Sequence, residues 1–194
     1  PVETLAHAPQ DERDRVATLL FALFFRELFD FRLIQTDPNF ANYLYDPASR
    51  RLALLDFGAT RRYSEPMVEA YRGLVVAGAA GDRAGLSAAA RAIGYFRADV
   101  GERQRRAVVE IFALACEPLR RRGAFDFAAS DLPARIRAAA LALGTDRGAW
   151  HTPPIDAMFL HRKAGGLYLL AARLRARVDV RAIAERHLGR VAHA

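Results

Sequence analysis

Apolar residues recur at the spacing of an α-helix along most of this chain, and this pattern limits the folds that it can adopt. In residues 11–31 the spacing repeats over several turns, with apolar side chains at Val16, Leu19, Leu20, Leu23 and Phe24. A helix with such a stripe must bury it against other elements. The same spacing predicts further helices at residues 66–80, 83–94, 101–121, 131–142, 155–177 and 179–190. The sequence therefore predicts a mainly α-helical fold.

The helical period gives way in one place to two short runs, at residues 43–45 and 52–55. Asp46 and Pro47 begin the residues between these runs, and Asp followed by Pro suits the start of a tight turn. We therefore predict a small β-hairpin at residues 43–55. The chain has no clear internal repeat and no long flexible linker, so the simplest organisation is one helical domain that carries this hairpin.

The composition is that of an ordinary globular domain, with 52% hydrophobic and 26% charged residues in 194. The longest apolar stretches, such as residues 19–25, are much shorter than the roughly 20 residues that cross a bilayer. We therefore expect no membrane span. Cys116 is the single cysteine, so it cannot form an internal disulfide, and its apolar surroundings predict a packing role.

The net charge is +7, and the cationic residues are spread along the chain. The densest arginine clusters lie at residues 103–106 and 120–122, on either side of one apolar segment. Neither cluster contains the interleaved aromatic residues that stack on bases, so we expect no nucleic acid partner. We interpret the clusters as solvated helix surface, with an anionic membrane surface or a protein partner as the alternative.

Polar residues with oxygen donors frame the hairpin. Asp37 and Asn42 lie five residues apart before it, and Asp56 follows it in the sequence Asp-Phe-Gly. Protein kinases have the same order of long helix, loop Asp, loop Asn, hairpin and Asp-Phe-Gly. Asp and Asn oxygens suit magnesium, and Gly58 would let the chain turn sharply there. The alternative is local turn chemistry at Asp37 and Asn42 and a strand-end cap at Asp56; we favour a catalytic site because the whole order is present.

The stretch RELFDFRLIQTDPNFANYLYDPASRRLALLDFGATRRYSE, at residues 26–65, closely resembles the UbiB family of atypical kinase-like ATPases, also called AarF-domain kinases. The resemblance is to the mitochondrial-type coenzyme Q biosynthesis branch. FDF at residues 125–127 and LHRKAGGLYLLAARLRARV at residues 160–178 resemble the downstream part of that branch. Many family members read His-Ala-Asp-Pro-His-Pro-Gly-Asn where residues 35–42 here read QTDPNFAN, and this departure indicates the branch.

The resemblance implies a protein-kinase-like C-terminal lobe with Asp37 in the catalytic-loop position. It also implies Asn42 and Asp56 as ligands of the magnesium ion that accompanies bound ATP or ADP. A role in ubiquinone biosynthesis follows from the branch, with a lipid or quinone precursor and other ubiquinone-biosynthesis proteins as partners. The expected location is cytoplasmic and peripheral to the inner membrane in a bacterium, or on the matrix side in a mitochondrion.

Several features separate this chain from a protein kinase. Thr36 stands where many protein kinases carry an arginine that pairs with a phosphorylated loop, and helix is predicted soon after Asp-Phe-Gly, which leaves no peptide platform. No lysine, glycine or strand pattern precedes Asp37 to supply the phosphate-contacting lobe. We therefore expect residues 1–194 to be the C-terminal lobe of a longer enzyme and to be inactive in isolation.

Two other functions stay open from the sequence. One is a kinase-like phosphotransferase that acts on a small soluble substrate, and the other is a non-catalytic helical scaffold that binds a membrane or a protein partner. His161 and Arg162 imitate the start of a kinase catalytic loop, but Lys163, the only lysine, follows them. We predict a structural role for this segment, in a helix whose Gly165 and Gly166 permit close packing.

Overall fold

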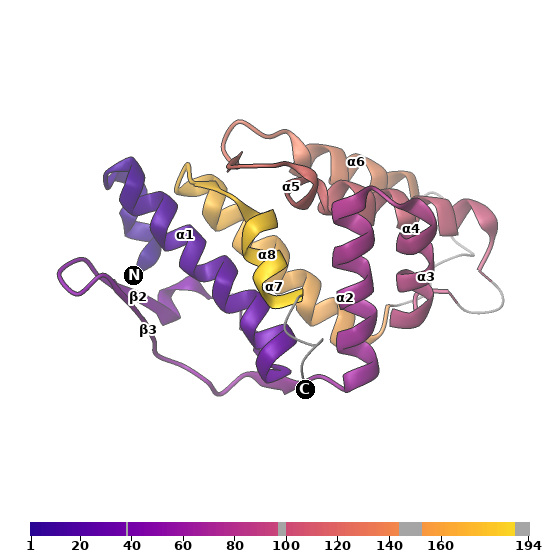
Figure 1. Ribbon diagram of the computed structural model, residues 1–194, viewed down its shortest axis with the longest axis horizontal. Coiled ribbons are helices and arrows are strands. Elements are labelled where there is room, and N and C mark those ends of the chain that lie inside the picture. The colour runs from indigo at the N-terminus through magenta and orange to yellow at the C-terminus, as the bar shows by residue number, and fades with distance from the viewer. Residues whose placement is uncertain (38, 97–99, 144–152, 189–194) are drawn as a thin grey trace.

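The computed structural model describes residues 1–37, 39–96, 100–143 and 153–188, and shows a mainly helical molecule (Figure 1). The α-helices of this described part are α1 Gln10–Phe25, α2 Glu65–Ala80, α3 Arg83–Ile93, α4 Glu102–Ala115, α5 Glu117–Arg120, α6 Leu132–Leu143, α7 Ile155–Arg173 and α8 Val180–Leu188. Short turns of other helix types are η1 Val2–His7, η2 Arg26–Phe31 and η3 Phe40–Asn42.

The strands are short and pair antiparallel, two by two. The pairs are β1 Leu33–Gln35 with β4 Thr60–Arg62, β2 Tyr43–Asp46 with β3 Arg51–Leu54, and β5 Phe125–Asp126 with β6 Arg177–Val178. The predicted hairpin is the β2–β3 pair. The other two pairs were not predicted, because strands of two or three residues are too short to show a period-2 pattern.

The helices lie in the predicted ranges, with one break and one early end. The helix predicted at residues 101–121 is two helices, because Cys116 leaves helical geometry between α4 and α5. Pro118 explains the break, since proline has no N–H to continue the α4 hydrogen bonds. The helix predicted at residues 155–177 ends at Arg173, and Arg175 then takes a positive φ of 51° that turns the chain into β6. The predicted end of the last helix, at residues 189–190, lies outside the described residues.

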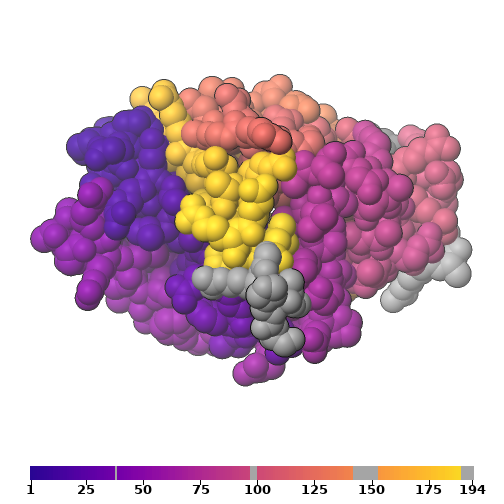
Figure 2. Space-filling view, viewed as in Figure 1, coloured from indigo at the N-terminus to yellow at the C-terminus, as the bar shows by residue number. Residues whose placement is uncertain are grey.

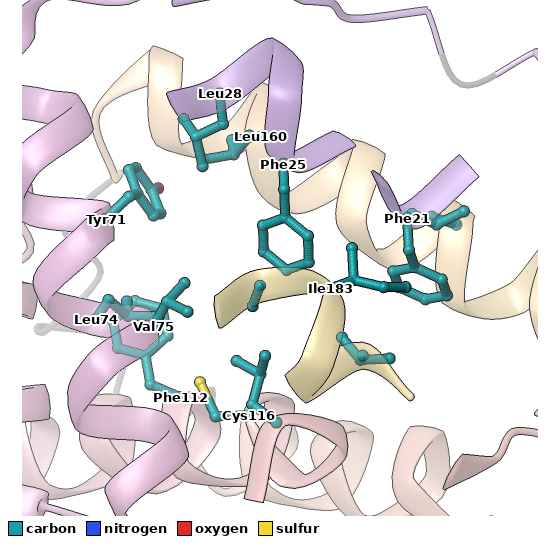
Figure 3. Packing of buried hydrophobic residues seen from close by; sticks show 14 of the residues in the cluster. Phe21, Phe25, Leu28, Tyr71, Leu74, Val75, Phe112, Cys116, Leu160 and Ile183 are labelled. Atoms are coloured by element: carbon teal, nitrogen blue, oxygen red, sulfur yellow. The ribbon is translucent and has the colours of Figure 1, made fainter. Parts of the chain in front are cut away.

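The helices share one apolar core. Helix α1 packs against α7 and α8, α2 packs against α3, α5 and α8, and α4 packs against α3 and α6. Buried side chains from these helices meet in the middle of the molecule (Figure 3); they include Phe21, Phe25, Leu28, Tyr71, Leu74, Phe112, Leu160 and Ile183. On one face α8 lies between α1 and α2 (Figure 2). No helix among the described residues has both the length and the apolar character that a bilayer crossing needs.

Cys116 packs in the core, as predicted, and it explains a glycine in α2. The Cys116 thiol is buried, and burial raises its pKa to about 12. A Cβ atom at Gly78 would overlap the Cys116 side chain, so only glycine fits there. The close packing predicted for Gly165 is wrong, since a Cβ atom at that position would have no neighbour within 4 Å.

A half-buried polar cluster surrounds His161 of α7. The hydroxyls of Tyr71 and Tyr95 lie 3.0 Å from Nε2 and 2.9 Å from Nδ1 of the imidazole. Phe112 packs edge-on against the same ring. Hydrogen bonds at both ring nitrogens fit the structural role predicted for this histidine, because neither nitrogen is left to act on a ligand.

We expect the protein to lose stability as the pH falls from about 6.5 to about 4, since His161 resists protonation. Burial lowers the pKa of His161 to about 4 from an ordinary value of 6.5. Between these values the unfolded chain binds a proton at this position and the folded chain does not, so the free energy of unfolding falls as the pH falls. The difference corresponds to about 3 kcal/mol.

Urea denaturation over this pH range measures the effect. His161→Phe should flatten the dependence, whereas His7→Ala, at an exposed histidine, should leave it unchanged. An unchanged dependence in His161→Phe would contradict the assignment.

Candidate functional site

The site begins where α1 changes from an α-helix to a π-helical turn. In η2 the wider turn brings three consecutive side chains, Glu27, Leu28 and Phe29, into the interior. The turn ends at Arg32, whose φ of 53° lies in the left-handed region and reverses the chain into β1. π-Helical turns often occur at functional sites. Here the turn directs the chain toward Asp37.

Strand pairing holds the loop of Asp37 beside the Asp-Phe-Gly segment. In the β1–β4 pair, Gln35 lies opposite Thr60. One residue further on, the backbone N–H and the hydroxyl of Thr36 both donate to the Ala59 carbonyl, at 2.7 and 3.0 Å. Ala59 directly follows Asp-Phe-Gly. Hydrogen bonds to the Ala59 carbonyl therefore hold the segment that carries Asp37 beside the segment that carries Asp56.

Asp37 and Asn42 are in direct contact. The Asn42 Nδ2 donates to Asp37 Oδ2 at 2.9 Å, and the Asn39 backbone N–H donates to Asp37 Oδ1 at 3.1 Å. The Asn39 side chain in turn accepts from the Ala41 N–H at 3.1 Å and caps η3. The local turn chemistry that was the alternative interpretation is thus present, and it fixes the loop. Because Asn42 donates through Nδ2, its Oδ1 remains an acceptor.

The β2–β3 hairpin brings Asp56 next to Asn42. The Leu55 N–H donates to the Asn42 carbonyl at 2.9 Å, which extends the hairpin by one residue beyond the Tyr43–Leu54 pair. Asp56 is the next residue, and its Oδ1 accepts from the Gly58 N–H at 2.7 Å. The chain bends at Gly58 and Ala59, as predicted, although Gly58 does not have a positive φ. Glycine is favoured because a Cβ atom would lie 3.1 Å from Asp56 Oδ1.

The donor set at this point fits a hard divalent cation. Asp37 and Asn42 are half-buried, and Asp56 is exposed, so all three can be reached from solvent. Carboxylate and amide oxygens, such as those of Asp56 and Asn42, are ligand types that Mg²⁺ binds, with water or phosphate oxygens completing its shell. Among the described residues no group of three or more His, Cys, Asp or Glu side chains could hold a metal ion. The candidate set differs from such groups, because it includes the Asn42 amide oxygen.

A buried polar group beneath the loop was missed by sequence reasoning. Lys163 of α7 forms an ion pair with Glu27, and both side chains are buried. Burial raises the pKa of Glu27 and lowers the pKa of Lys163, since removal from water costs each charge more than the pairing returns. The Tyr43 hydroxyl donates to Gln35 Oε1 at 3.2 Å. Burial, together with the charges of Glu27 and Asp37, raises the pKa of Tyr43.

The segment after Asp-Phe-Gly is tied to the N-terminal turn of α7. Arg61 forms an ion pair with Asp156 and stacks over the Phe159 ring at 5.0 Å. The Tyr63 hydroxyl donates to the Asp156 carbonyl at 2.7 Å. Helix α2 then begins at Glu65. The chain thus passes from β4 into α2 with no extended segment in between.

The arginine clusters lie away from these residues. Helix α4, which carries the first cluster, is on the opposite side of the molecule from the β2–β3 hairpin, and the second cluster lies at the end of α5, away from the hairpin (Figure 1). Arg106 pairs with Glu102 on the surface of α4, and Arg120 donates to the Ala113 carbonyl. Surface contacts of this kind contribute little to stability.

The family model and the two curated proteins given below, which are similar to this chain, are all described as atypical kinases or kinase-like. The model of the ABC1 atypical kinase-like domain matches residues 2–90. The atypical kinase COQ8B, mitochondrial, of Rattus norvegicus is 35% identical over 181 residues, which is 93% of this chain and 34% of that protein. The atypical kinase COQ8, mitochondrial, of Saccharomyces cerevisiae is 32% identical over 176 residues, which is 90% of this chain and 35% of that protein. The chain thus spans about a third of the length of these curated relatives.

Among solved structures, Rv3197 of Mycobacterium tuberculosis in its complex with erythromycin has the same fold. Its TM-score is 0.68, and the match covers 93% of this chain and 44% of that one. The sequence identity is 19%, so this likeness concerns the fold alone.

Proposed function

The chain belongs to the ABC1 atypical kinase-like family, known also as the UbiB family, and from this membership we propose that it forms the C-terminal lobe of a kinase-like ATPase. The proposed enzyme binds ATP or ADP with Mg²⁺ and supports ubiquinone biosynthesis. Its proposed place is at the surface of a membrane that holds quinone precursors, on the matrix side in a mitochondrion or the cytoplasmic side in a bacterium. Lipids and other ubiquinone-biosynthesis proteins are its proposed partners.

One observation carries this proposal, namely the convergence of the three predicted residues at the end of one hairpin. Asn42 and Asp56 would hold the magnesium ion, which neutralises phosphate charge when it is bound. Asp37 would face the attacking oxygen and either accept its proton or orient it. The contact between Asn42 and Asp37 would fix the position of Asp37 relative to the ion. The protein therefore contributes positioning and charge, the main requirements of phosphoryl transfer.

In a kinase-like site the phosphates also contact a lysine, and the lysine of this chain is engaged elsewhere. Lys163 is the only lysine in residues 1–194, and its ammonium group is buried against Glu27. The curated relatives are about three times as long as this chain, and we propose that the lysine that contacts phosphate lies outside residues 1–194. This supports the proposal that the chain works as one of two lobes.

A small or lipid acceptor, or water, suits the site better than a peptide. Helix α2 begins at Glu65, and Arg61 and Tyr63 tie the preceding residues to α7. A kinase needs a longer segment after Asp-Phe-Gly to lay out a peptide substrate. We therefore propose ATP hydrolysis or transfer to a small molecule. Release of ADP and phosphate in equal amounts indicates hydrolysis, and release of ADP in excess indicates transfer to another acceptor.

Asp37→Asn in the full-length protein should lower kcat for ADP release by a factor of about ten or more, with the Kd of the magnesium nucleotide changed by less than about threefold. The amide oxygen can still accept one of the two hydrogen bonds that Asp37 accepts from Asn42 and from the Asn39 N–H, so we expect the loop to stay near its shape, while the carboxylate that handles the proton is lost. Asp46→Asn, in the turn of the same hairpin, should leave both quantities unchanged. Equal turnover in Asp37→Asn and the wild type would contradict the role of Asp37. A wild-type protein that neither binds nucleotide nor releases ADP, with or without anionic vesicles, would favour the scaffold.

A further inference from the structure

A chain of buried polar contacts joins α7 to both ends of the candidate catalytic loop. It starts at the ion pair of Lys163 and Glu27, whose side chains are only 9% and 7% exposed. Glu27 also accepts a hydrogen bond from the backbone of Gln35, two residues before Asp37. The side chain of Gln35 accepts from the hydroxyl of Tyr43, the residue after Asn42. This network of contacts therefore holds the candidate catalytic loop at both ends, at Gln35 and at Tyr43.

Burying this ion pair costs desolvation free energy that an apolar pair at the same positions would not. Burial opposes the charge on both partners, and an apolar pair of similar volume is often equally or more stable than a buried ion pair. The ion pair adds a geometric constraint, because its hydrogen bonds form only in a few arrangements of the two side chains. The π-helical turn η2 has the same effect, since it directs Glu27 into the interior where it meets both Lys163 and Gln35.

The choice of lysine in an arginine-rich chain agrees with this role. Lysine occurs once in the 194 residues, and among the residues that the structure describes it is this lysine that lies buried beneath the loop. An arginine has five N–H donors in a planar fork, all of which would need partners in the interior. A lysine ammonium is a compact charge on a flexible stem. The sequence therefore uses lysine where a single carboxylate must be held at a fixed point.

We propose that Glu27 and Lys163 are positioning residues which, through Gln35 and Tyr43, set the geometry of the loop that carries Asp37 and Asn42. The effect on the loop follows from the contacts alone. The effect on turnover rests in addition on the proposed function, so two separate measurements are needed.

The test uses the full-length protein and the double variant in which Glu27→Met and Lys163→Met remove the buried charges together. Thermal unfolding should shift by no more than about 5 °C, because apolar residues of similar volume replace the pair. Hydrogen exchange without nucleotide, followed by mass spectrometry, should show the amides of residues 39–46 exchanging about tenfold faster or more, with those of α2 unchanged. In the same variant kcat should fall about tenfold or more, since small displacements of catalytic groups have large effects.

A matched control separates loop positioning from the general loss of a buried polar group. His161→Leu removes a half-buried polar side chain from the same helix, two residues from Lys163, and its partners Tyr71 and Tyr95 lie outside the loop. It should leave exchange in residues 39–46 unchanged. If the double variant does not fold, Tyr43→Phe decides, because it keeps the buried ring and removes only the hydroxyl that bonds Gln35.

Each outcome bears on the proposal. Faster exchange confined to residues 39–46 supports it, whether or not the wild type turns over nucleotide, and a wild type without turnover would overturn only the proposed function. Wild-type exchange in a folded double variant, or in Tyr43→Phe where that variant decides, would overturn the positioning role. Faster exchange with unchanged kcat would show that the loop geometry does not govern turnover and would overturn that part of the proposal.

Discussion

Asp56→Asn should abolish magnesium-dependent nucleotide binding by the full-length protein, with Kd raised on the order of 100-fold or more. The substitution removes the one carboxylate of the proposed ligand pair, Asn42 and Asp56, and keeps the size of the side chain. Residues that merely support metal ligands already cost 10- to 100-fold when replaced, so loss of a ligand should cost at least as much. The amide oxygen at position 56 can still accept from the Gly58 N–H, so the local backbone should persist.

Calorimetric titration with ADP in the presence of Mg²⁺ measures this effect. In EDTA the wild type and Asp56→Asn should bind nucleotide equally weakly, because the difference between them acts through the ion. Asp126→Asn is a suitable control, since this aspartate accepts backbone hydrogen bonds after β5 and lies outside the candidate site. Unchanged affinity of Asp56→Asn for the magnesium nucleotide would remove Asp56 from the ligand set.

Lys163→Met should lower the free energy of unfolding by about 3–5 kcal/mol at neutral pH, the range found when one partner of a buried ion pair is removed. The methionine fills the space of the lysine stem, so the loss comes from the Glu27 carboxylate, which stays buried without its cation. Urea denaturation gives the value. Adding Glu27→Met to the same protein should recover most of the loss, because the second substitution removes the stranded charge.

The loss of unfolding free energy in Lys163→Met, called the deficit below, should be larger at higher pH. Burial already raises the pKa of Glu27 above its ordinary value of 4.5, and loss of the lysine raises it further. When a carboxyl group has a higher pKa in the folded state than in the unfolded state, the free energy of unfolding falls as the pH rises from 4.5 through the folded-state pKa. The deficit should therefore be small near pH 4.5 and largest at neutral and higher pH. A deficit that is constant with pH would show that Glu27 is not the stranded group.

The candidate catalytic residues could be predicted from the sequence because the contacts that gather them are local. Asp37 and Asn42 touch across five residues, and a hairpin closes the distance from Asn42 to Asp56. The residue types and their order resemble a known arrangement, and the catalytic and metal-binding roles of these residues stay predictions. The helices could be predicted for a similar reason, since each helix forms from hydrogen bonds between near neighbours and its apolar spacing is visible within the segment.

The tertiary structure alone decided which buried groups meet. Lys163 and Glu27 are 136 residues apart, and the hydroxyl groups that bind His161 come from two other parts of the chain. Gly78 has to be a glycine only because Cys116 packs against it. Helical periodicity shows which face of a helix is apolar, but it does not show which face of which other helix will cover it. A lysine or a histidine within such a pattern has the same spacing whether it points to solvent or to a partner, because the partner is supplied by packing between helices.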